Sequence, residues 1–259
     1  MNQKSVGRSL SETKSNFTKP TDLLEQQKGC LEFMIKAVIF DLDGTLKEFN
    51  LDIKACRTKI INRLTQEGFP RSLFSINESA FDMLKKIKKD LIAEDGKKQE
   101  FTKIQDIIFS VVEDFELEAA RTAKLFTGIS ETLQALRDMK LELALCTISS
   151  EKTTNYILKR FHIEQFFDAV ITRESVFEVK PHPKHLEAAL DALKVRAQEA
   201  LLVGDSVKDI QCAVQLNVLA VGVTTGLSSI EELSRSGAHY VASSANEIPI
   251  LVKQLQKKI

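Results

Sequence analysis

The chain has 259 residues, of which 43% are hydrophobic and 28% are charged, as in globular proteins with a sizeable core. Lysine plus arginine and aspartate plus glutamate both number 36, so the formal net charge is zero, which argues against a general electrostatic affinity for nucleic acid. No apolar run approaches the roughly 18 residues that a membrane span needs, and this excludes a membrane protein.

The four cysteines are far apart and form neither a Cys-x-x-Cys pair nor a zinc-type cluster with histidine. Because unpaired cysteine usually behaves as a small buried hydrophobic residue in a reducing compartment, we expect free, buried thiols. These residues are Cys30, Cys56, Cys146 and Cys212. The first residues also lack the apolar centre of a secretory signal, so the expected location is cytoplasmic.

Residues 1–33 differ in composition from the rest of the chain. Seven serines or threonines lie among the first 21 positions, and no apolar residue recurs with a period before Leu23. Such a segment buries too little surface to offset its ordering entropy, so we predict a disordered extension. Met34 directly precedes the first strong strand, and we expect the functional chain to begin near it.

The first predicted strand, 37–40, runs directly into Asp41-Leu42-Asp43-Gly44-Thr45-Leu46. A turn of the Asp/Gly type would need one aspartate and the glycine, whereas this segment has two carboxylates two positions apart. In open α/β sheets, ligands bind at the carboxyl ends of parallel strands. Asp41 and Asp43 are therefore predicted to serve a function there.

Residues 47–126 predict a helical insertion, because apolar residues recur at helical spacing and no strand pattern interrupts them. The predicted apolar faces contain Ile53, Ile60, Ile61 and Leu64, then Ala80, Leu84, Ile87 and Leu91, then Ile104, Ile107, Ile108, Val111 and Phe115. A run of lysines, Lys85, Lys86, Lys88 and Lys89, is expected on a solvated face rather than in a binding patch. Arg57 and Arg121 are candidate substrate contacts, although an exposed helix face is the favoured interpretation for both.

After the insertion, short apolar runs alternate with amphipathic segments. We predict strands at 143–146, 169–171, 200–203 and 218–221, and helices at about 129–139, 151–161, 184–194 and 207–216. Strands that alternate with helices form a parallel sheet covered on both faces. The predicted fold is a doubly wound α/β domain made of residues 34–46 and 127–259.

Two of these strand ends offer groups that suit an anion. Thr147-Ile148-Ser149-Ser150 places a hydroxyl and free backbone N–H groups just before a helix, although such a segment alone is more often an N-cap. Lys180 follows the strand at 169–171 and precedes Pro181, where a lone lysine is usually a surface residue.

The predicted strand at 200–203 ends in a second pair of carboxylates, Asp205 and Asp209. Taken alone, Asp205 reads equally well as a helix cap and Asp209 as a first-turn acid. Together with Asp41 and Asp43 they would form an acidic cluster, whose repulsion a cation relieves. Oxygen ligands of this kind favour a hard divalent ion, and Mg²⁺ suits them best.

The order Asp-x-Asp-Gly-Thr-Leu, strand-end Thr, Lys and Gly-Asp-x-x-x-Asp resembles the haloacid dehalogenase (HAD) superfamily from about residue 35 onward. A helical insertion directly after the first motif is similar to the C1-type cap of subfamily I and its phosphoglycolate phosphatase-like members. The resemblance implies a Rossmann-like core with an inserted, all-helical cap at 47–126.

The resemblance also implies a reaction, in which Asp41 attacks a phosphate monoester and forms an aspartyl-phosphate that water then cleaves. Asp43 would be the general acid and base, and its carbonyl would contact Mg²⁺. Asp41 and Asp205 would be carboxylate ligands of Mg²⁺, with Asp209 a ligand or its neighbour. The phosphoryl oxygens would be held by Thr147, the amide of Ile148 and Lys180.

Two positions depart from the superfamily pattern. Ile148 stands where the second motif usually has asparagine or another small polar residue, so the expected contact there is its backbone amide. Lys47-Glu48 replaces the commonest Val-Asp-Ser continuation of the first motif.

The predicted function is Mg²⁺-dependent hydrolysis of a small phosphorylated metabolite. Phosphoglycolate is the leading candidate by analogy, and sugar phosphates, nucleotides and pyrophosphate stay open. A phosphosugar mutase is an alternative, because such enzymes keep both acids of the first motif. A phospho-receiver module or a catalytically silent binding protein are further alternatives, although the order of the motifs and the complete acid set favour an enzyme.

Overall fold

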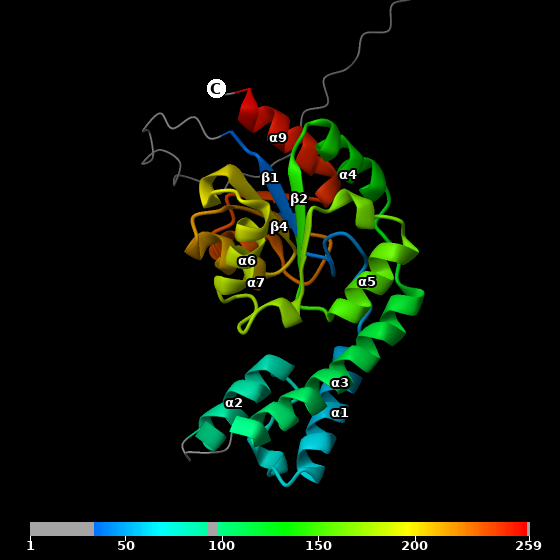
Figure 1. Cartoon of the computed structure of the whole chain (residues 1–259), viewed down its shortest axis with the longest axis vertical. Coiled ribbons are helices and arrows are strands. Elements are labelled where there is room, and N and C mark those ends of the chain that lie inside the picture. The colour runs from blue at the N-terminus through cyan, green and yellow to red at the C-terminus, as the bar shows by residue number, and fades with distance from the viewer. Residues whose placement is uncertain (1–33, 93–97, 258–259) are drawn as a thin grey trace, which may run out of the picture.

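The computed structural model describes residues 34–92 and 98–257, which form a parallel sheet with helices on both faces and a group of helices at one end (Figure 1). The sheet has six strands in the order β3-β2-β1-β4-β5-β6, and every pair is parallel. The strands are β1 (Ala37–Phe40), β2 (Glu142–Cys146), β3 (Ala169–Ile171), β4 (Ala200–Gly204), β5 (Leu219–Val223) and β6 (Tyr240–Ala242).

Alternate side chains of the strands build two separate cores, because successive residues of a strand point to opposite faces. On one face, Val38 and Phe40 pack with α4 (Ile129–Asp138), α5 (Glu151–Arg160) and α9 (Ile248–Gln256). On the other, Ala37 and Ile39 pack with α6 (Lys184–Leu193), α7 (Val207–Gln215) and α8 (Ile230–Arg235). Figure 1 shows α6 and α7 on the opposite side of the sheet from α4 and α5.

Between β1 and β2 lie three helices with a core of their own: α1 (Ile53–Gln66), α2 (Ala80–Ile92) and α3 (Lys98–Thr122). Inward-facing side chains of the three helices, among them Ile60, Leu84 and Ile108, form the third apolar cluster. Asp52 begins α1, and its Oδ1 accepts a hydrogen bond from Ala55 N at 2.9 Å. In Figure 1 this helical insertion lies beyond the end of the sheet to which β1 points.

The two chain segments that enter and leave the insertion run side by side. Lys47 and Leu125 form an antiparallel bridge. Glu48 N donates to Lys124 O at 2.9 Å, and Phe126 N donates to Leu46 O at 3.1 Å. The insertion is thus attached to the sheet through one paired, two-stranded connection.

The structure confirms the predicted fold class. Five predicted strands and four predicted helices are present with end-points within two residues of those expected, while β6, α8 and α9 were not predicted. Strand β6 has three residues and lies at one edge of the sheet, as β3 does at the other edge, so its length does not explain why β3 was predicted and β6 was not. The three inserted helices fall inside 47–126, whose limits as a domain stay a prediction.

Cys56, Cys146 and Cys212 are buried and free, as predicted, whereas Cys30 and the predicted extension 1–33 lie outside the described residues. Across residues 34–92 and 98–257, no helix combines the length and hydropathy needed to cross a membrane.

Candidate active site

Three neighbouring strands bring their polar end residues to one point. Strand β1 pairs with β2 on one side and with β4 on the other, so Asp41, Thr147 and Asp205 follow strand ends that lie next to each other. All three side chains are buried. Polar groups placed after buried parallel strands in this way form the usual ligand site of an open α/β sheet.

Lys180 reaches into this group from the segment between β3 and α6, and its ammonium is completely surrounded by acceptors. Lys180 Nζ donates to Asp41 Oδ1 at 2.7 Å, to Asp209 Oδ1 at 2.5 Å and to the carbonyl of Cys146 at 2.7 Å. Although burial opposes the charge, Asp209 and Asp41 hold the pKa of Lys180 well above its ordinary value. The residue is therefore a fixed positive charge beside Asp41.

Asp41, Asp205 and Asp209 form an acidic cluster in which one carboxylate oxygen of each residue lies within 4.8 Å of one oxygen of the other two. Burial raises the pKa of Asp41 well above its usual range, and the neighbouring Asp209 and Asp205 raise it further against the opposing effect of Lys180. Burial, and then the charge of Asp209, raise the pKa of Asp205 to about 6. One ammonium therefore does not balance the three carboxylates, and the cluster favours either protons or an added cation.

Asp209 and Asp205 are also held by hydrogen bonds. Asp209 Oδ2 accepts from Ser206 Oγ at 2.5 Å in a capping box that begins α7. Asp205 Oδ2 accepts from Leu227 N at 2.7 Å. These contacts fix both carboxylates toward Asp41 and leave little freedom to turn away.

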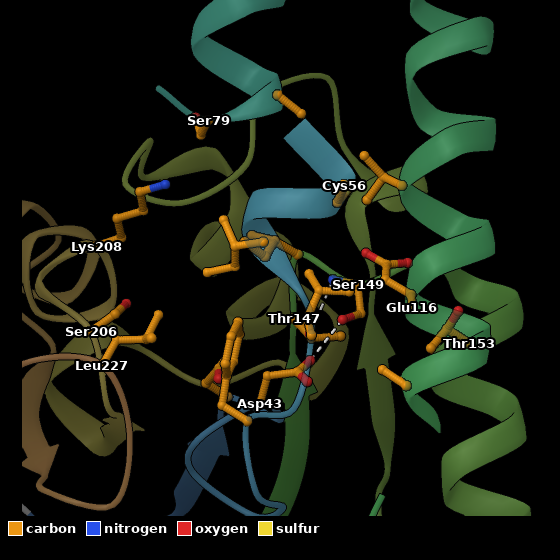
Figure 2. A pocket seen from close by; sticks show the side chains of 18 of the residues that line it. Asp43, Cys56, Ser79, Glu116, Thr147, Ser149, Thr153, Ser206, Lys208 and Leu227 are labelled. Carbon is orange, nitrogen blue, oxygen red and sulfur yellow. Dashed lines mark hydrogen bonds between the residues drawn. The ribbon is translucent and has the colours of Figure 1, made fainter. Parts of the chain in front are cut away.

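Asp43 faces a different set of partners, away from the acidic cluster. Its Oδ2 accepts from Ser149 Oγ at 2.7 Å, a bond drawn in Figure 2. Its Oδ1 forms an ion pair with Lys47 Nζ at 2.5 Å. Lys47 is itself buried and also donates to Glu48 O and Asn50 Oδ1. Asp43 is thus held between a hydroxyl and a buried ammonium.

The segment after β2 presents backbone and hydroxyl groups to the same cavity. Thr147 Oγ1 accepts from Ser149 N at 3.1 Å, and Ser150 begins α5 as its N-cap. Ser150 N is already used, because it donates to Glu116 Oε2 at 3.1 Å from helix α3. Glu116 also accepts from Arg173 Nη1 at 2.6 Å, so a buried ion pair joins the insertion to the sheet beside this segment.

These residues line a cavity of about 210 Å³ that is shared by the sheet and the helical insertion. The sheet side contributes Asp41, Asp43, Thr147, Ile148, Lys180, Asp205 and Asp209. The insertion contributes Cys56, Arg57, Ile60, Ser79, Ala80, Phe81, Val112, Glu116 and Ala119. Figure 2 shows Lys208 on the sheet side, extending toward Ser79 of the insertion.

The structure brings all seven predicted site residues to this one cavity. Asp43 contributes no carboxylate to the acidic cluster, since its side chain turns toward Ser149 and Lys47. Arg57 lines the cavity, against the favoured interpretation that it occupies an exposed face, while Arg121 is exposed as expected.

Sequence reasoning assigned no role to several residues of the site. The unusual Lys47 after the first motif was a signal, because it replaces an apolar residue where the chain leaves the sheet. Glu116 was a second signal, since it lies four residues after Val112 and four before Ala120, on a face of α3 that turns inward. The sequence around Lys208 and Arg173 contains no pattern that would have identified either of them as a site residue.

The model of the haloacid dehalogenase-like hydrolase family matches residues 38–223. The chain belongs to this family. The resemblance drawn from its motifs is therefore confirmed, and the protein is a HAD-like hydrolase.

Similar proteins share most of its length. The chain is 28% identical to the pyrophosphatase PpaX of Bacillus mycoides (strain KBAB4) over 220 residues, which are 84% of this chain and 97% of that protein. It is 30% identical to PpaX of Bacillus cereus (strain Q1) over 178 residues, or 68% and 77% of the two chains. A solved structure from Haemophilus somnus 129pt, described as a predicted phosphoglycolate phosphatase, has a TM-score of 0.58 at 22% identity. It covers 84% of this chain and 97% of its own, and this likeness shows the fold.

Proposed function

We propose that this HAD-like hydrolase is a Mg²⁺-dependent phosphatase that cleaves a small phosphorylated metabolite through an aspartyl-phosphate. The observation that carries the proposal is the placement of Asp41, whose carboxylate lies 2.7 Å from Lys180 Nζ and next to Asp205 and Asp209. The relatives that are named pyrophosphatases, together with the fold shared with a structure described as a phosphoglycolate phosphatase, support phosphoryl chemistry.

In the first step, a carboxylate oxygen of Asp41 attacks phosphorus and the bond from phosphorus to the leaving oxygen breaks. Asp43 gives its proton to that oxygen, so the product leaves as a neutral alcohol group. In the second step, water attacks the aspartyl-phosphate and passes a proton to Asp43. The bond between phosphorus and Asp41 then breaks, which releases inorganic phosphate and restores both acids.

The charge that develops on the phosphoryl oxygens needs fixed donors, because phosphoryl transfer depends chiefly on positioning and electrostatic stabilisation. Lys180, the Thr147 hydroxyl and the backbone N–H of Ile148 are proposed to supply them. The amide of Ser150 is not proposed as a donor, because it is already bonded to Glu116.

The residues present fit a magnesium ion. Three buried carboxylates share one ammonium, and all offer the hard oxygen ligands that Mg²⁺ prefers. Asp41 and Asp205, with the carbonyl of Asp43, would hold the ion, and Asp209 would share its charge between the ion and Lys180. When bound, the ion supplies positive charge that neutralises the phosphoryl group.

The helical insertion is proposed to act as the cap over this site. Residues from α1, α2 and α3 line the cavity opposite the strand ends. A closed cap would exclude water during the attack by Asp41 and would select the leaving group by its shape and charge. The cavity of about 210 Å³ lies below the roughly 300–1,000 Å³ of pockets for drug-sized ligands, which favours a small substrate.

Replacing Asp41 by Asn tests the proposal, because asparagine keeps the shape of the side chain but cannot form the aspartyl-phosphate. We expect phosphate release from an aryl phosphate to fall by at least about a thousandfold. The assay is run on wild type with Mg²⁺, on wild type with EDTA, and on Asp41→Asn. Undiminished release in EDTA or in the variant would exclude this mechanism. Free phosphate as the product, rather than an isomerised sugar phosphate, separates hydrolysis from mutase activity.

A further inference from the structure

Lys208 differs from the other lysines of the cavity because its ammonium makes no direct hydrogen bond or ion pair with the part of the chain that the structure describes. Lys47 and Lys180 each donate to three oxygens. Within the described residues, by contrast, no atom accepts a hydrogen bond from Lys208 Nζ, although the side chain is only partly exposed and lines the cavity. Holding a partly desolvated ammonium without a partner is unfavourable, and a ligand with negative charge would relieve it.

The position of Lys208 separates it from the site of phosphoryl transfer. It lies in the first turn of α7, and its side chain extends away from the strand ends toward Ser79, at the start of α2 (Figure 2). Asp43, the proposed proton donor to the leaving oxygen, lies across the cavity in the same view. Lys208 therefore faces the space that the leaving group of a bound substrate would occupy.

The charges around Lys208 favour an anion there. Arg57 lines the same cavity from α1, and its guanidinium uses one donor on the carbonyl of Ile76 at 3.0 Å. Lys85 is a further neighbouring cation. Two acids, Asp82 and Asp209, oppose these cations. Asp82 Oδ2 already accepts from the hydroxyl of Ser79 at 2.6 Å and from its backbone N–H at 3.2 Å, and Asp209 already accepts from Lys180 Nζ.

We propose that Lys208 binds a second anionic group, carried by the leaving group of the substrate. The preferred substrates are then phosphate esters or anhydrides whose departing half bears a carboxylate or a phosphate. This inference rests on the proposed phosphatase function and adds the substrate class to it. It also explains why a lysine whose ammonium has no hydrogen-bond acceptor among the described residues faces the cavity that Asp41 and Asp43 share.

Two esters that differ only in the anionic group test the proposal. Phosphoglycolate carries a carboxylate where 2-hydroxyethyl phosphate carries a hydroxymethyl group, so the ratio of their kcat/KM values isolates that charge. A charged hydrogen bond corresponds to a factor of roughly 10–100, so we expect Lys208→Met to lower the ratio by at least about tenfold. Because the ratio is measured within one preparation, any loss of folded enzyme cancels. Pyrophosphate, as a third substrate, distinguishes a phosphate from a carboxylate as the bound anion.

Two further variants complete the experiment. Lys208→Glu should shift preference from phosphoglycolate toward 2-aminoethyl phosphate, whose leaving group carries a positive charge. Lys88→Met removes an exposed lysine from α2 and should leave the ratio unchanged. A ratio that is the same in wild type and Lys208→Met would overturn the proposal while leaving the phosphatase function intact. If wild type releases phosphate from the aryl phosphate of the earlier assay but from neither phosphoglycolate nor pyrophosphate, this inference fails alone; if it releases phosphate from none of them, the proposed function fails as well.

Discussion

At the scale of single residues, the site is dominated by an imbalance of charge. Asp41, Asp205 and Asp209 are buried together, and Lys180 is the ammonium that contacts two of them. This excess of negative charge is reflected in Asp205, because burial and then the charge of Asp209 disfavour its ionised form and raise its pKa to about 6. A divalent cation bound at the proposed site would therefore compete with protons for the same carboxylates.

This competition predicts how Mg²⁺ stabilises the fold at different pH. In the metal-free protein the pKa of Asp205 rises from 3.8 to about 6, so its contribution to stability is lost as pH rises through that interval. Bound Mg²⁺ removes the repulsion that develops. The increase in Tm on adding Mg²⁺ should therefore be larger at pH 7.5 than at pH 5. Thermal melts with and without Mg²⁺ measure it, and Asp205→Asn should flatten the dependence. An equal increase at both pH values would contradict the prediction.

Lys47 provides a second prediction at this scale. Its buried ammonium and the hydroxyl of Ser149 hold Asp43 from two sides. Lys47→Met should free the carboxylate to turn away from the leaving oxygen, so kcat should fall by about tenfold with little change in KM. Lys47→Arg, which keeps the charge, should restore part of kcat. A loss confined to KM would instead indicate that Lys47 binds substrate.

Site residues that belong to a sequence motif could be predicted. Site residues whose role depends on contacts with distant parts of the chain could not. Asp41, Asp43, Asp205 and Asp209 follow apolar strand runs at short spacing, so the sheet itself brings them together. Lys208 lies in the same helix turn as Asp209, yet its spacing gives no sign that the start of α2 lies opposite, nor that no acceptor for its ammonium is found in the described part of the chain. Such a property depends on contacts between segments far apart in the chain.

At the scale of elements, helix α3 connects the insertion to the sheet through one buried ion pair. Glu116 accepts from Arg173 Nη1 and from Ser150 N, so a single carboxylate from α3 holds the segment that follows β2. Burial raises the pKa of Glu116 despite the opposing charge of Arg173. The contact therefore helps to hold the insertion over the strand ends, together with Arg160 Nη1, which donates to the carbonyls of Ala120 and Ala123.

Breaking this pair should be costly for stability. Arg173→Met leaves a buried carboxylate unpaired and should lower the free energy of unfolding by about 3–5 kcal/mol, measured by urea denaturation. The double variant Glu116→Gln, Arg173→Met removes both charges and should recover part of that loss. The single variant Glu116→Gln completes the cycle. If the losses of unfolding free energy in the two single variants sum to the loss in the double variant, the ion pair does not couple the two elements.

Elements buried on both faces were the easiest to predict. Strand β1 is a continuous apolar run because helices cover both of its sides, and the same holds for β4. The edge strand β6 was missed although β3, of the same length at the opposite edge, was predicted, so strand length does not account for the omission. The paired segments around Lys47 and Leu125 were missed because each pairs with a partner nearly eighty residues away.

At the scale of the whole molecule, the sheet and the insertion contribute different parts of the proposed active site. Residues proposed for attack, proton transfer and cation binding come from the strand ends, while α1, α2 and α3 close the cavity around the departing half of the substrate. Lys208 is the exception, because it belongs to the sheet side but faces the insertion. Reaction and selectivity are consequently separable by substitution, as the variants of Asp41 and Lys208 are designed to test.

The insertion enters and leaves the sheet through neighbouring, hydrogen-bonded segments at Leu46–Glu48 and Lys124–Phe126. A unit joined at one such point can be lengthened, rebuilt or exchanged without altering the order of the strands. Exchange of such a module between related genes would change the metabolite that is bound, while Asp41, the proposed nucleophile, stays in place on the sheet.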